Sequence, residues 1–457
     1  MIVLHRNKLN FRHLCHLFIG GIMSLLFTQA ALFGNEEDGW VRFRGPNGAG
    51  LSSEGGALAT EWNWDANLKW KLELTGKGSS SPIILGDKIF LTSYTGYGLE
   101  RETPGNPGEL VRHVICIDAA AQKVAWQVDI PATDEDVFEG FIQEHGYASS
   151  TPVTDGERLF VFLGKTGVLA FDLEGKELWR TSVGTQSDPA KWGGGSSLIL
   201  VGDVLVVNAG NEGRSIVGLD KNSGDVSWKI EDDSFGNSWS TPVLVDVDGR
   251  TETVFSMPGK VLAINAANGE VFWEAESPVT NTTCASLAEG NGVVYAMGGR
   301  AGQAIAIRCG GSGDVTSTHV VWQKPLAAGI GTPIFVDGRL YWNSRGIAYC
   351  ADAATGEYIY RERLKAEQPA GNQGQRRSPA GDYASPIAIG DNVIFTQRNG
   401  QVFILSSSSA FNLVASNQFP NDDSLFNATP AVNGAGELVF RSEKMLYCLG
   451  PANQKEN

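Results

Sequence analysis

The residue types that most often carry chemistry are few and widely separated in this chain. After residue 34 there are three histidines, His113, His145 and His319, and none stands at the short spacing that brings two imidazoles onto one metal ion. The sequence contains no CxxC pair, HExxH motif, phosphate-binding loop or nucleophile elbow. It therefore predicts no metal centre and no catalytic constellation.

Residues that could bind a partner gather in a few segments. The segment from Pro131 to Ala148 is acidic and aromatic, the segment from Lys365 to Tyr383 is basic, and a shorter segment runs from Gly184 to Gly195. The candidate binding residues in them are Phe138, Phe141, Glu144, His145, Tyr147, Trp192, Arg376 and Arg377. An acidic aromatic loop facing a basic one could clamp a peptide or a glycan. In the alternative interpretation these loops are solvated, an Arg–Glu pair and His145 order them, and Trp192 packs on a neighbouring element.

A repeated phrase indicates what positions these segments. It reads Ser-x-Pro, two short apolar strands around a Gly or Asp turn, a third strand, a Gly turn, and a closing Trp. The Pro position, or its Leu substitute, recurs at Pro82, Pro152, Leu198, Pro242, Leu287, Pro333, Pro386 and Pro430. Apart from two insertions the period stays near 45 residues. Several short strands in such a period predict one blade of a β-propeller per repeat.

The closing aromatic residue is expected to pack between neighbouring blades. It recurs as Trp70, Trp126, Trp179, Trp228, Trp273 and Trp322. Tyr360 replaces it in unit six, and unit seven has no clear equivalent. A buried Trp removes roughly 150–250 Å² from water, so one residue of this kind per blade suits a seam between blades.

The array of repeats begins with a lone strand and ends with an incomplete unit, and the two parts complement each other. After Pro430, unit eight has only two strands' worth of residues, whereas Leu68–Leu74 is a lone fourth strand with its Trp. We expect this N-terminal strand to complete the last blade, because a closed ring leaves no exposed strand edge. The predicted fold is all-β, an eight-bladed propeller of four-stranded antiparallel blades closed by the N-terminal strand.

The N-terminus and the overall charge bear on location and partners. Basic residues, an apolar run from Leu17 to Phe33 and small residues near Gly34 are typical of a secretory signal peptide, with an uncleaved membrane anchor as the alternative. We expect residues 1–34 to be this signal, 35–67 an extension, 68–450 the propeller and 451–457 a polar tail. The chain would then be exported to the periplasm or an equivalent compartment, as a monomer without a transmembrane segment.

A net charge of -15 argues against nucleic acid and anionic membranes as partners.

The insertions lengthen only certain connections of the predicted propeller. They fall between the second and third strands of unit one and between successive blades, and such connections emerge on one common face. That face is the predicted binding face, since loops on a rigid scaffold commonly carry binding residues.

Five cysteines remain after residue 34, an odd number that cannot all pair, and Cys116, Cys350 and Cys448 replace a small residue of the third strand. We expect these three to be buried core thiols.

Together, the Ser-x-Pro phrase, the third strand "LxAxD" and the closing Trp resemble the repeat of pyrroloquinoline-quinone dehydrogenases. The same repeat is similar to non-catalytic propellers, including the outer-membrane assembly lipoprotein of Gram-negative bacteria. The opening residues 40–48, WVRFRGPNG, resemble the start of exported quinoprotein-like repeat proteins of planctomycete-type bacteria. The resemblance implies a propeller over about residues 68–449.

The resemblance leaves two functions open. A quinone dehydrogenase would bind pyrroloquinoline quinone with calcium and would need a base Asp, and many carry two adjacent cysteines over the cofactor. This chain has no adjacent cysteines, and no Asp can be placed as a calcium ligand. We therefore predict no cofactor and a non-catalytic module that binds a protein or polymer through the face with the long loops. The alternative is a quinone-dependent alcohol or sugar dehydrogenase, or a quinone-binding relative.

Overall fold

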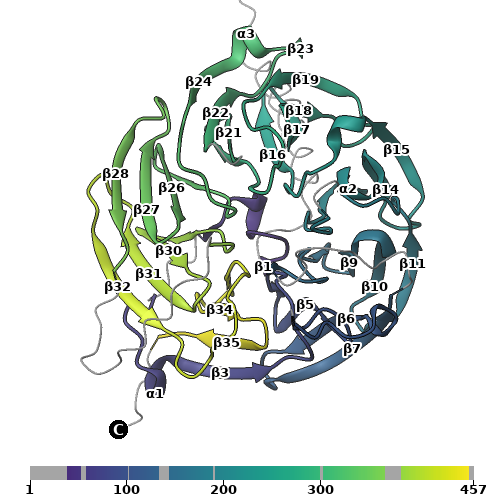
Figure 1. Ribbon diagram of the computed structural model, residues 1–457, viewed down its shortest axis with the longest axis vertical. Helices are drawn as coiled ribbons and strands as arrows, with labels where there is room; N and C mark the ends of the chain where they lie inside the picture. The colour runs from purple at the N-terminus through teal and green to yellow at the C-terminus, as the bar shows by residue number, and fades with distance from the viewer. Residues whose placement is uncertain are drawn as a thin grey trace, which may run out of the picture.

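Eight antiparallel sheets surround a central axis in the computed structural model (Figure 1). The structure describes residues 39–52, 58–100, 102–132, 144–188, 191–298, 302–365 and 382–451. It confirms the predicted all-β, eight-bladed propeller. The predicted signal peptide, residues 1–34, lies outside the described residues, as do Phe138, Phe141, Arg376 and Arg377, and the division of the chain into segments stays a prediction.

The blades follow one another along the chain, and the strands of each blade are named from the axis outward. Blade 1 comprises β4 (Ile83–Leu85), β5 (Lys88–Thr95), β6 (Val111–Asp118) and β7 (Lys123–Pro131). Blade 2 comprises β8 (Val153–Thr154), β9 (Arg158–Phe162), β10 (Val168–Asp172) and β11 (Glu177–Thr181). Blade 3 comprises β12 (Ile199–Val201), β13 (Val204–Ala209), β14 (Ser215–Asp220) and β15 (Val226–Glu231). Blade 4 comprises β16 (Val243–Val247), β17 (Arg250–Met257), β18 (Lys260–Ile264) and β19 (Val271–Glu276).

The second half of the ring repeats this plan. Blade 5 comprises β20 (Ala288–Gly290), β21 (Val293–Gly298), β22 (Gln303–Arg308) and β24 (Val320–Lys324). Blade 6 comprises β25 (Ile334–Val336), β26 (Arg339–Ser344), β27 (Ile347–Asp352) and β28 (Tyr358–Arg363). Blade 7 comprises β29 (Ile387–Ile389), β30 (Asn392–Thr396), β31 (Gln401–Ser406) and β32 (Leu413–Gln418). Blade 8 comprises β33 (Ala431–Val432), β34 (Leu438–Arg441), β35 (Met445–Leu449) and the N-terminal β3 (Leu68–Glu73).

Short elements extend the blades. Strands β1 (Gly39–Trp40), β2 (Leu51–Ser52) and β23 (Gly313–Asp314) add a fifth strand to blades 1, 7 and 4. The helices are single turns, α1 (Trp64–Asn67), α2 (Gly210–Gly213) and α3 (Thr316–His319), with 3₁₀ turns η2 (Pro46–Gly48), η3 (Pro107–Glu109), η6 (Gly164–Thr166) and η7 (Asp233–Phe235).

The closing aromatic residue always faces a small residue across the third and fourth strands. The pairs are Cys116–Trp126, Ala170–Trp179, Gly218–Trp228, Ala263–Trp273, Ala306–Trp322, Cys350–Tyr360 and Cys448–Trp70. A β-bulge adjoins each pair, and bulges redirect side chains and strengthen twist. The small partner therefore makes room for the large ring. The three cysteines expected in the core are buried at these positions as free thiols.

Four of these tryptophans join one blade to the next by the same contact. The indole nitrogens of Trp126, Trp179, Trp228 and Trp322 donate to carbonyls of the following blade at 2.8–3.1 Å. Each ring covers the glycine turn between that blade's third and fourth strands. At Gly269, for example, φ is +75° and a Cβ would come within 2.8 Å of the Trp228 ring, so only glycine fits.

Trp273 makes a different contact because the corresponding turn in blade 5 is longer. Its indole nitrogen donates to the Glu252 carboxylate at 2.7 Å, within its own blade. Glu252 is fully buried and also accepts from the Arg250 side chain and the Gly310 backbone. The buried carboxylate is thereby paired and hydrogen-bonded, as burial of a charge requires.

Blade 7 exchanges the sizes of the facing pair, which explains its missing Trp. Ile404 stands at the small position and Ala415 opposite it. Trp62 and Trp64, which precede β3, pack in the same hydrophobic cluster as Ala415. Trp62 lies 5.5 Å from the Phe419 ring and 5.2 Å from the Phe440 ring. The N-terminal segment therefore supplies the aromatic rings that unit seven lacks.

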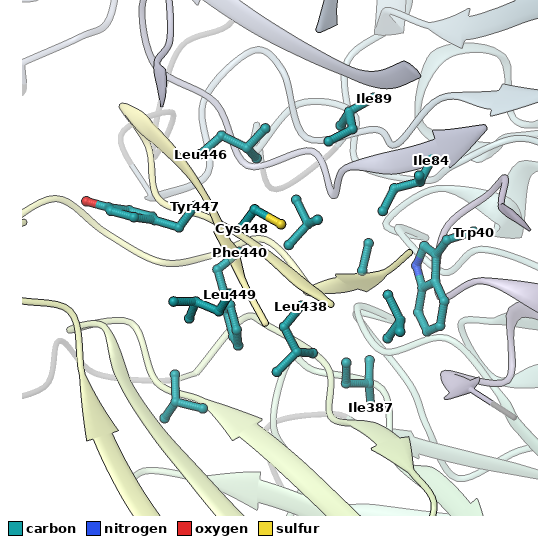
Figure 2. Packing of buried hydrophobic residues seen from close by; sticks show 14 of the residues in the cluster. Trp40, Ile84, Ile89, Ile387, Leu438, Phe440, Leu446, Tyr447, Cys448 and Leu449 are labelled. Atoms are coloured by element: carbon teal, nitrogen blue, oxygen red, sulfur yellow. The ribbon is translucent and has the colours of Figure 1, made fainter. Parts of the chain in front are cut away.

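The ring closes through the N-terminal strand, as predicted. Strand β3 pairs antiparallel with β35, from Leu68–Leu449 to Glu73–Met445. Figure 2 shows the resulting core, where Leu446 and Cys448 of blade 8 lie close to Ile84 and Ile89 of blade 1. The seam between blades 8 and 1 thus has a continuous apolar interior.

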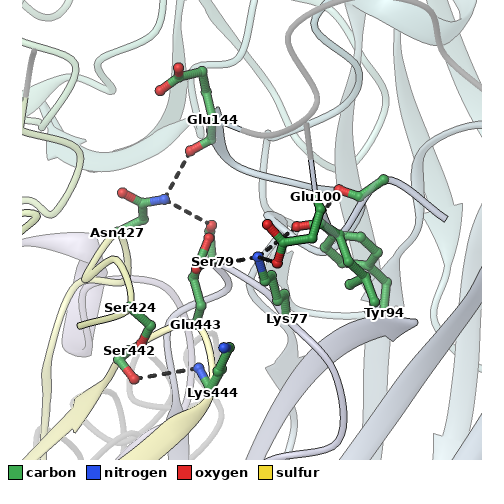
Figure 3. A network of polar contacts seen from close by, with 12 residues as sticks. Lys77, Ser79, Tyr94, Glu100, Glu144, Ser424, Asn427, Ser442, Glu443 and Lys444 are labelled. Atoms are coloured by element: carbon green, nitrogen blue, oxygen red, sulfur yellow. Dashed lines mark hydrogen bonds and ion pairs between the residues drawn. The ribbon is translucent and has the colours of Figure 1, made fainter. Parts of the chain in front are cut away.

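Buried polar contacts reinforce the same seam. The Arg441 guanidinium of blade 8 donates to the Ser80 and Thr92 carbonyls of blade 1, both at 2.7 Å. Burial lowers the pKa of Arg441 to about 9, and the carbonyl contacts offset part of its desolvation. The polar contacts of Figure 3 lie nearby, where Lys77 pairs with Glu100 at 3.0 Å and approaches Glu443 at 4.0 Å.

Replacing Trp70 tests this closure. Trp70→Ala should lower the free energy of unfolding by about 3–5 kcal/mol, because the ring is 9% exposed and its loss leaves a cavity at the seam. Trp70→Phe should retain most of the stability, and Lys71→Ala, exposed on the same strand, should change it by less than about 0.5 kcal/mol. Urea denaturation gives the comparison. A Trp70→Ala protein as stable as the parent would mean that the Trp70 ring does not stabilise the closure.

Candidate binding site

A ring of hydroxyl groups encircles the axis at the start of the innermost strands. In each repeat the residue directly before the marker Pro or Leu is Ser or Thr: Ser81, Thr151, Ser197, Thr241, Ser286, Thr332, Ser385 and Thr429. The backbone N–H of each donates to the side-chain oxygen of the next at 2.9–3.0 Å. The last bond runs from the Thr429 N–H to the Ser81 hydroxyl, so the eight bonds form a closed circle. Serine and threonine alternate around it.

The N-terminal residues 39–52, which we call the plug, cross the axis directly beyond this ring (Figure 1). Strand β1 pairs with β4 at the positions of Ile84 and Leu85, and β2 pairs with β29. Between them the Val41 carbonyl accepts from the Thr154 N–H of blade 2 at 3.1 Å. The plug therefore covers the inner edges of blades 1 and 7 and blocks the channel on one side of the ring.

Two residues of the plug fix its path. Gly45 has a φ of +64°, and a Cβ there would come within 2.6 Å of the Trp40 ring, so the sharp turn requires glycine. Arg44 is 1% exposed and donates to the Ala49 and Pro333 carbonyls at 3.1 and 3.0 Å. Burial lowers the pKa of Arg44 to about 9. A guanidinium held by backbone carbonyls ties the plug to blade 6.

A cavity of about 460 Å³ lies on the other side of the hydroxyl ring. Phe43 of the plug contributes to it, and every other lining residue belongs to one of the eight blade-to-blade connections. The cavity therefore lies on the face that carries these connections, which we call the connection face. Its lining combines the eight ring hydroxyls with three aromatic residues of the connections: Trp192, Trp239 and Tyr383.

Glu144 and Arg398 meet at the edge of this cavity. The Arg398 guanidinium donates to the Glu144 carboxylate at 2.9 Å and to the Asn427 side chain at 2.9 Å. Asn427 donates in turn to the Glu144 carbonyl, as Figure 3 shows. Arg398 also lies over the Tyr383 ring, 4.4 Å from its centre. Three distant segments of the sequence are thus joined, and Glu144 has its charge partner in blade 7.

His145 and Trp192 are held by contacts within their own loops and by a hydrogen bond between the His145 ring and the Trp192 backbone. His145 Nδ1 lies 2.6 Å from the Ser149 hydroxyl, which also donates to the His145 carbonyl at 2.9 Å. Burial lowers the pKa of His145, so the imidazole is neutral at pH 7. Asp188 accepts from the Trp192 and Gly193 backbone N–H groups, and the Trp192 ring packs on Trp239 with centres 5.0 Å apart.

Of the five remaining candidate residues, the structure describes only Tyr147. Tyr147 is 7% exposed and packs edge-on against Tyr94, with centres 5.5 Å apart, so its ring forms part of the core beneath the connection face. Phe138, Phe141, Arg376 and Arg377 fall in segments that the structure does not describe. Of the eight candidate binding residues, the structure therefore brings Glu144, His145 and Trp192 to one cavity.

The lining does not match the donor set that a calcium–quinone cofactor requires. Among the described lining residues Glu144 is the only carboxylate and is already paired, and none is a Lys or Arg that could balance the acidic groups of a quinone. Cys284 is a single thiol whose pKa burial raises to about 12. In the described parts of the chain, no cluster of three His, Cys, Asp or Glu side chains could hold a metal ion.

Sequence reasoning missed several cavity residues for different reasons. The hydroxyl ring had a visible signal, since the middle residue of the Ser-x-Pro phrase is Ser or Thr in all eight copies. Tyr383 ends the predicted segment from Lys365 to Tyr383, whereas Trp239 and Cys284 had no signal, because each lies in a short connection and they converge only once the ring closes.

The hydroxyl ring can be tested at Thr241. Thr241→Val keeps the shape but removes the acceptor of the Ser197 N–H, which should lower the free energy of unfolding by about 1–3 kcal/mol. Thr241→Ser keeps the acceptor and should be the more stable variant in the same denaturation series. Equal stability of the two variants would mean that the bond does not contribute.

Glu212 lies behind the cavity wall and provides a test by pH. It is 2% exposed, and burial raises its pKa from 4.5 to about 7, so between these pH values the folded state keeps a proton that the unfolded chain has lost, and stability falls as the pH rises from about 4.5 to 7. Glu212→Gln should leave stability nearly unchanged at pH 4 and raise it at pH 8, by up to about 3 kcal/mol. Denaturation of both proteins at the two pH values measures this, and an equal effect at both would show that the carboxyl titrates normally.

Comparisons with known proteins agree with this architecture. A family model described as outer membrane protein assembly factor BamB matches residues 111–362, more than half of the chain. Among solved structures, BamB from Moraxella catarrhalis is similar with a TM-score of 0.56 and 15% identity, covering 85% of this chain and 98% of that one. No curated protein matches the sequence.

Two alcohol dehydrogenases are also similar in fold. A europium-containing methanol dehydrogenase is similar with a TM-score of 0.63 and 10% identity, covering 92% of this chain and 99% of that one. A quinohemoprotein alcohol dehydrogenase from Comamonas testosteroni has a TM-score of 0.61 and 10% identity, with coverages of 93% and 82%. Identities this low show the fold alone. The match over more than half of the sequence shows more, and the chain belongs to the BamB-like family of quinoprotein-type propeller repeats.

Proposed function

We propose that this protein is an exported, non-catalytic propeller that binds a protein or polymer through its connection face. The observation that carries the proposal is the cavity of that face, which is closed at its base by the plug and lined from all eight connections. A pre-formed concave site of about 460 Å³ falls in the range of roughly 300–1,000 Å³ typical of ligand sites.

The chemistry of the lining supports binding over catalysis. A general base or nucleophile needs a pKa suited to proton transfer or an activating neighbour. In this cavity Glu144 is held in an ion pair, the Cys284 thiol is kept protonated by burial, and His145 bonds to its own loop. These groups order the site and leave no free acid–base pair among the described lining residues.

The proposed export rests on the N-terminal sequence and on the family. Residues 1–34 have the layout of a signal peptide. In the part of the chain that the structure describes, no helix is both long and apolar enough to cross a membrane. We further propose that the propeller is monomeric, because its ring is closed by β3 and the plug covers the inner edges of blades 1 and 7.

Photocrosslinking tests which face binds. A photoreactive phenylalanine analogue would replace Thr280 or Arg345, both exposed on the connection face, and Asp203 or Glu157, both exposed on the opposite face as matched controls. In cells of the source organism, adducts should form from the first two positions alone. Adducts from the control positions at equal yield would contradict the assignment of the face.

The alternative function, that of a quinone-dependent dehydrogenase, is tested with the same protein. Pyrroloquinoline quinone with Ca²⁺ should neither raise the melting temperature nor support dye reduction with alcohols or sugars, because the described lining offers no free carboxylate and no cation. Cofactor-dependent turnover would overturn the non-catalytic assignment.

A further inference from the structure

The lining of the cavity is close to electrically neutral. Glu144 is neutralised by Arg398 at 2.9 Å, His145 is uncharged at pH 7, and the other lining residues that the structure describes carry no charge. Transfer of a charged group into such a site would not be compensated. The cavity therefore favours an uncharged ligand.

The same lining is rich in hydroxyl groups with a donor to spare. Each of the eight ring oxygens accepts a backbone N–H, and among the described residues none of these eight hydroxyls donates to a protein acceptor. A hydroxyl has one proton and two acceptor sites. The O–H protons of the ring thus remain able to bond a ligand that carries many oxygen acceptors.

An aromatic platform stands on the wall of the cavity. Trp192 is half-buried, lines the cavity and packs against Trp239, which also lines it, with ring centres 5.0 Å apart. Its backbone is fixed by Asp188, which is itself buried. The negative face of an indole attracts the weakly positive C–H groups on one face of a sugar ring.

A peptide strand would lack its usual partners in this cavity. Extended peptides bind mainly by adding to an exposed sheet edge. In this protein the inner strands β4 and β29 already pair with β1 and β2, and the backbone N–H groups of the ring are all bonded to hydroxyls. At the level of the ring, the site therefore offers side-chain hydroxyls and an indole, while its backbone N–H groups are already bonded.

We propose that the cavity binds a neutral saccharide unit of a glycan, stacked on Trp192 and hydrogen-bonded to the hydroxyl ring. The inference rests on the proposed binding function of the connection face and names the ligand class for that same site.

Calorimetric titration of the exported full chain tests the proposal. The probes are neutral tetrasaccharides of glucose, xylose, mannose, galactose and N-acetylglucosamine, with tetragalacturonate as the anionic counterpart. At least one neutral probe should bind with a Kd of about 1 mM or tighter and change the tryptophan fluorescence, whereas tetragalacturonate should bind at least about tenfold more weakly. Absence of neutral binding at about 10 mM, or equal binding of the anionic probe, would overturn the proposal.

Substitutions of Trp192 locate the binding. Trp192→Leu keeps an apolar side chain but removes the aromatic face. It should therefore lower the affinity for the saccharide by about tenfold or more, whereas Trp192→Phe should retain most of the affinity. Trp228→Phe, in a seam between blades, is the matched control and should bind like the parent. Unchanged binding by Trp192→Leu would place the saccharide elsewhere and contradict the proposal.

The two proposals can fail separately. If crosslinks form at Thr280 and Arg345 but no saccharide binds, the connection face remains the binding surface and the saccharide assignment is wrong. If crosslinks favour the opposite face, both proposals fall.

Discussion

The backbone N–H of Thr429 donates to the Ser81 hydroxyl, and this bond joins the last repeat to the first. It completes a circle in which each blade supplies one acceptor to the blade before it. Each of the eight bonds is 2.9–3.0 Å long and joins the same position of successive repeats, so every innermost strand begins at the ring. The positions of the eight connections follow from this constraint, and the cavity that they line follows in turn.

The N-terminal segment has three roles in one stretch of sequence. Residues 39–52 fill one side of the channel, Trp62 and Trp64 supply the rings that blade 7 lacks, and Leu68–Glu73 completes blade 8. A propeller without this segment would have an open channel, a poorly filled seam and an unpaired edge. The segment therefore closes one side of the channel and leaves a cavity that is open on the connection face. The hydroxyl-lined and charge-neutral interior of this cavity differs from a site suited to a calcium-bound quinone.

The fold could be predicted from the sequence because propeller repeats are local. A period near 45 residues, the marker Pro and the closing Trp fix the blades without knowledge of distant contacts. The size exchange at Ile404 and Ala415 and the path of the plug could not be predicted, since both depend on pairings between ends of the chain. The residues of the site could likewise be predicted only in part. Trp192 and Tyr383 lie in insertions that the sequence marks, whereas Trp239 and Cys284 join them only through closure of the ring.

Hydrogen exchange at the eight ring amides tests the closed circle most directly. Amides that open only by global unfolding share one protection level. The account predicts that the N–H groups of Ser385 and Thr429, next to the closure, exchange as slowly as those of Thr151 and Ser197 on the far side of the ring. Exchange at Ser385 and Thr429 that is faster by orders of magnitude would show a ring that opens at its seam and would contradict the account.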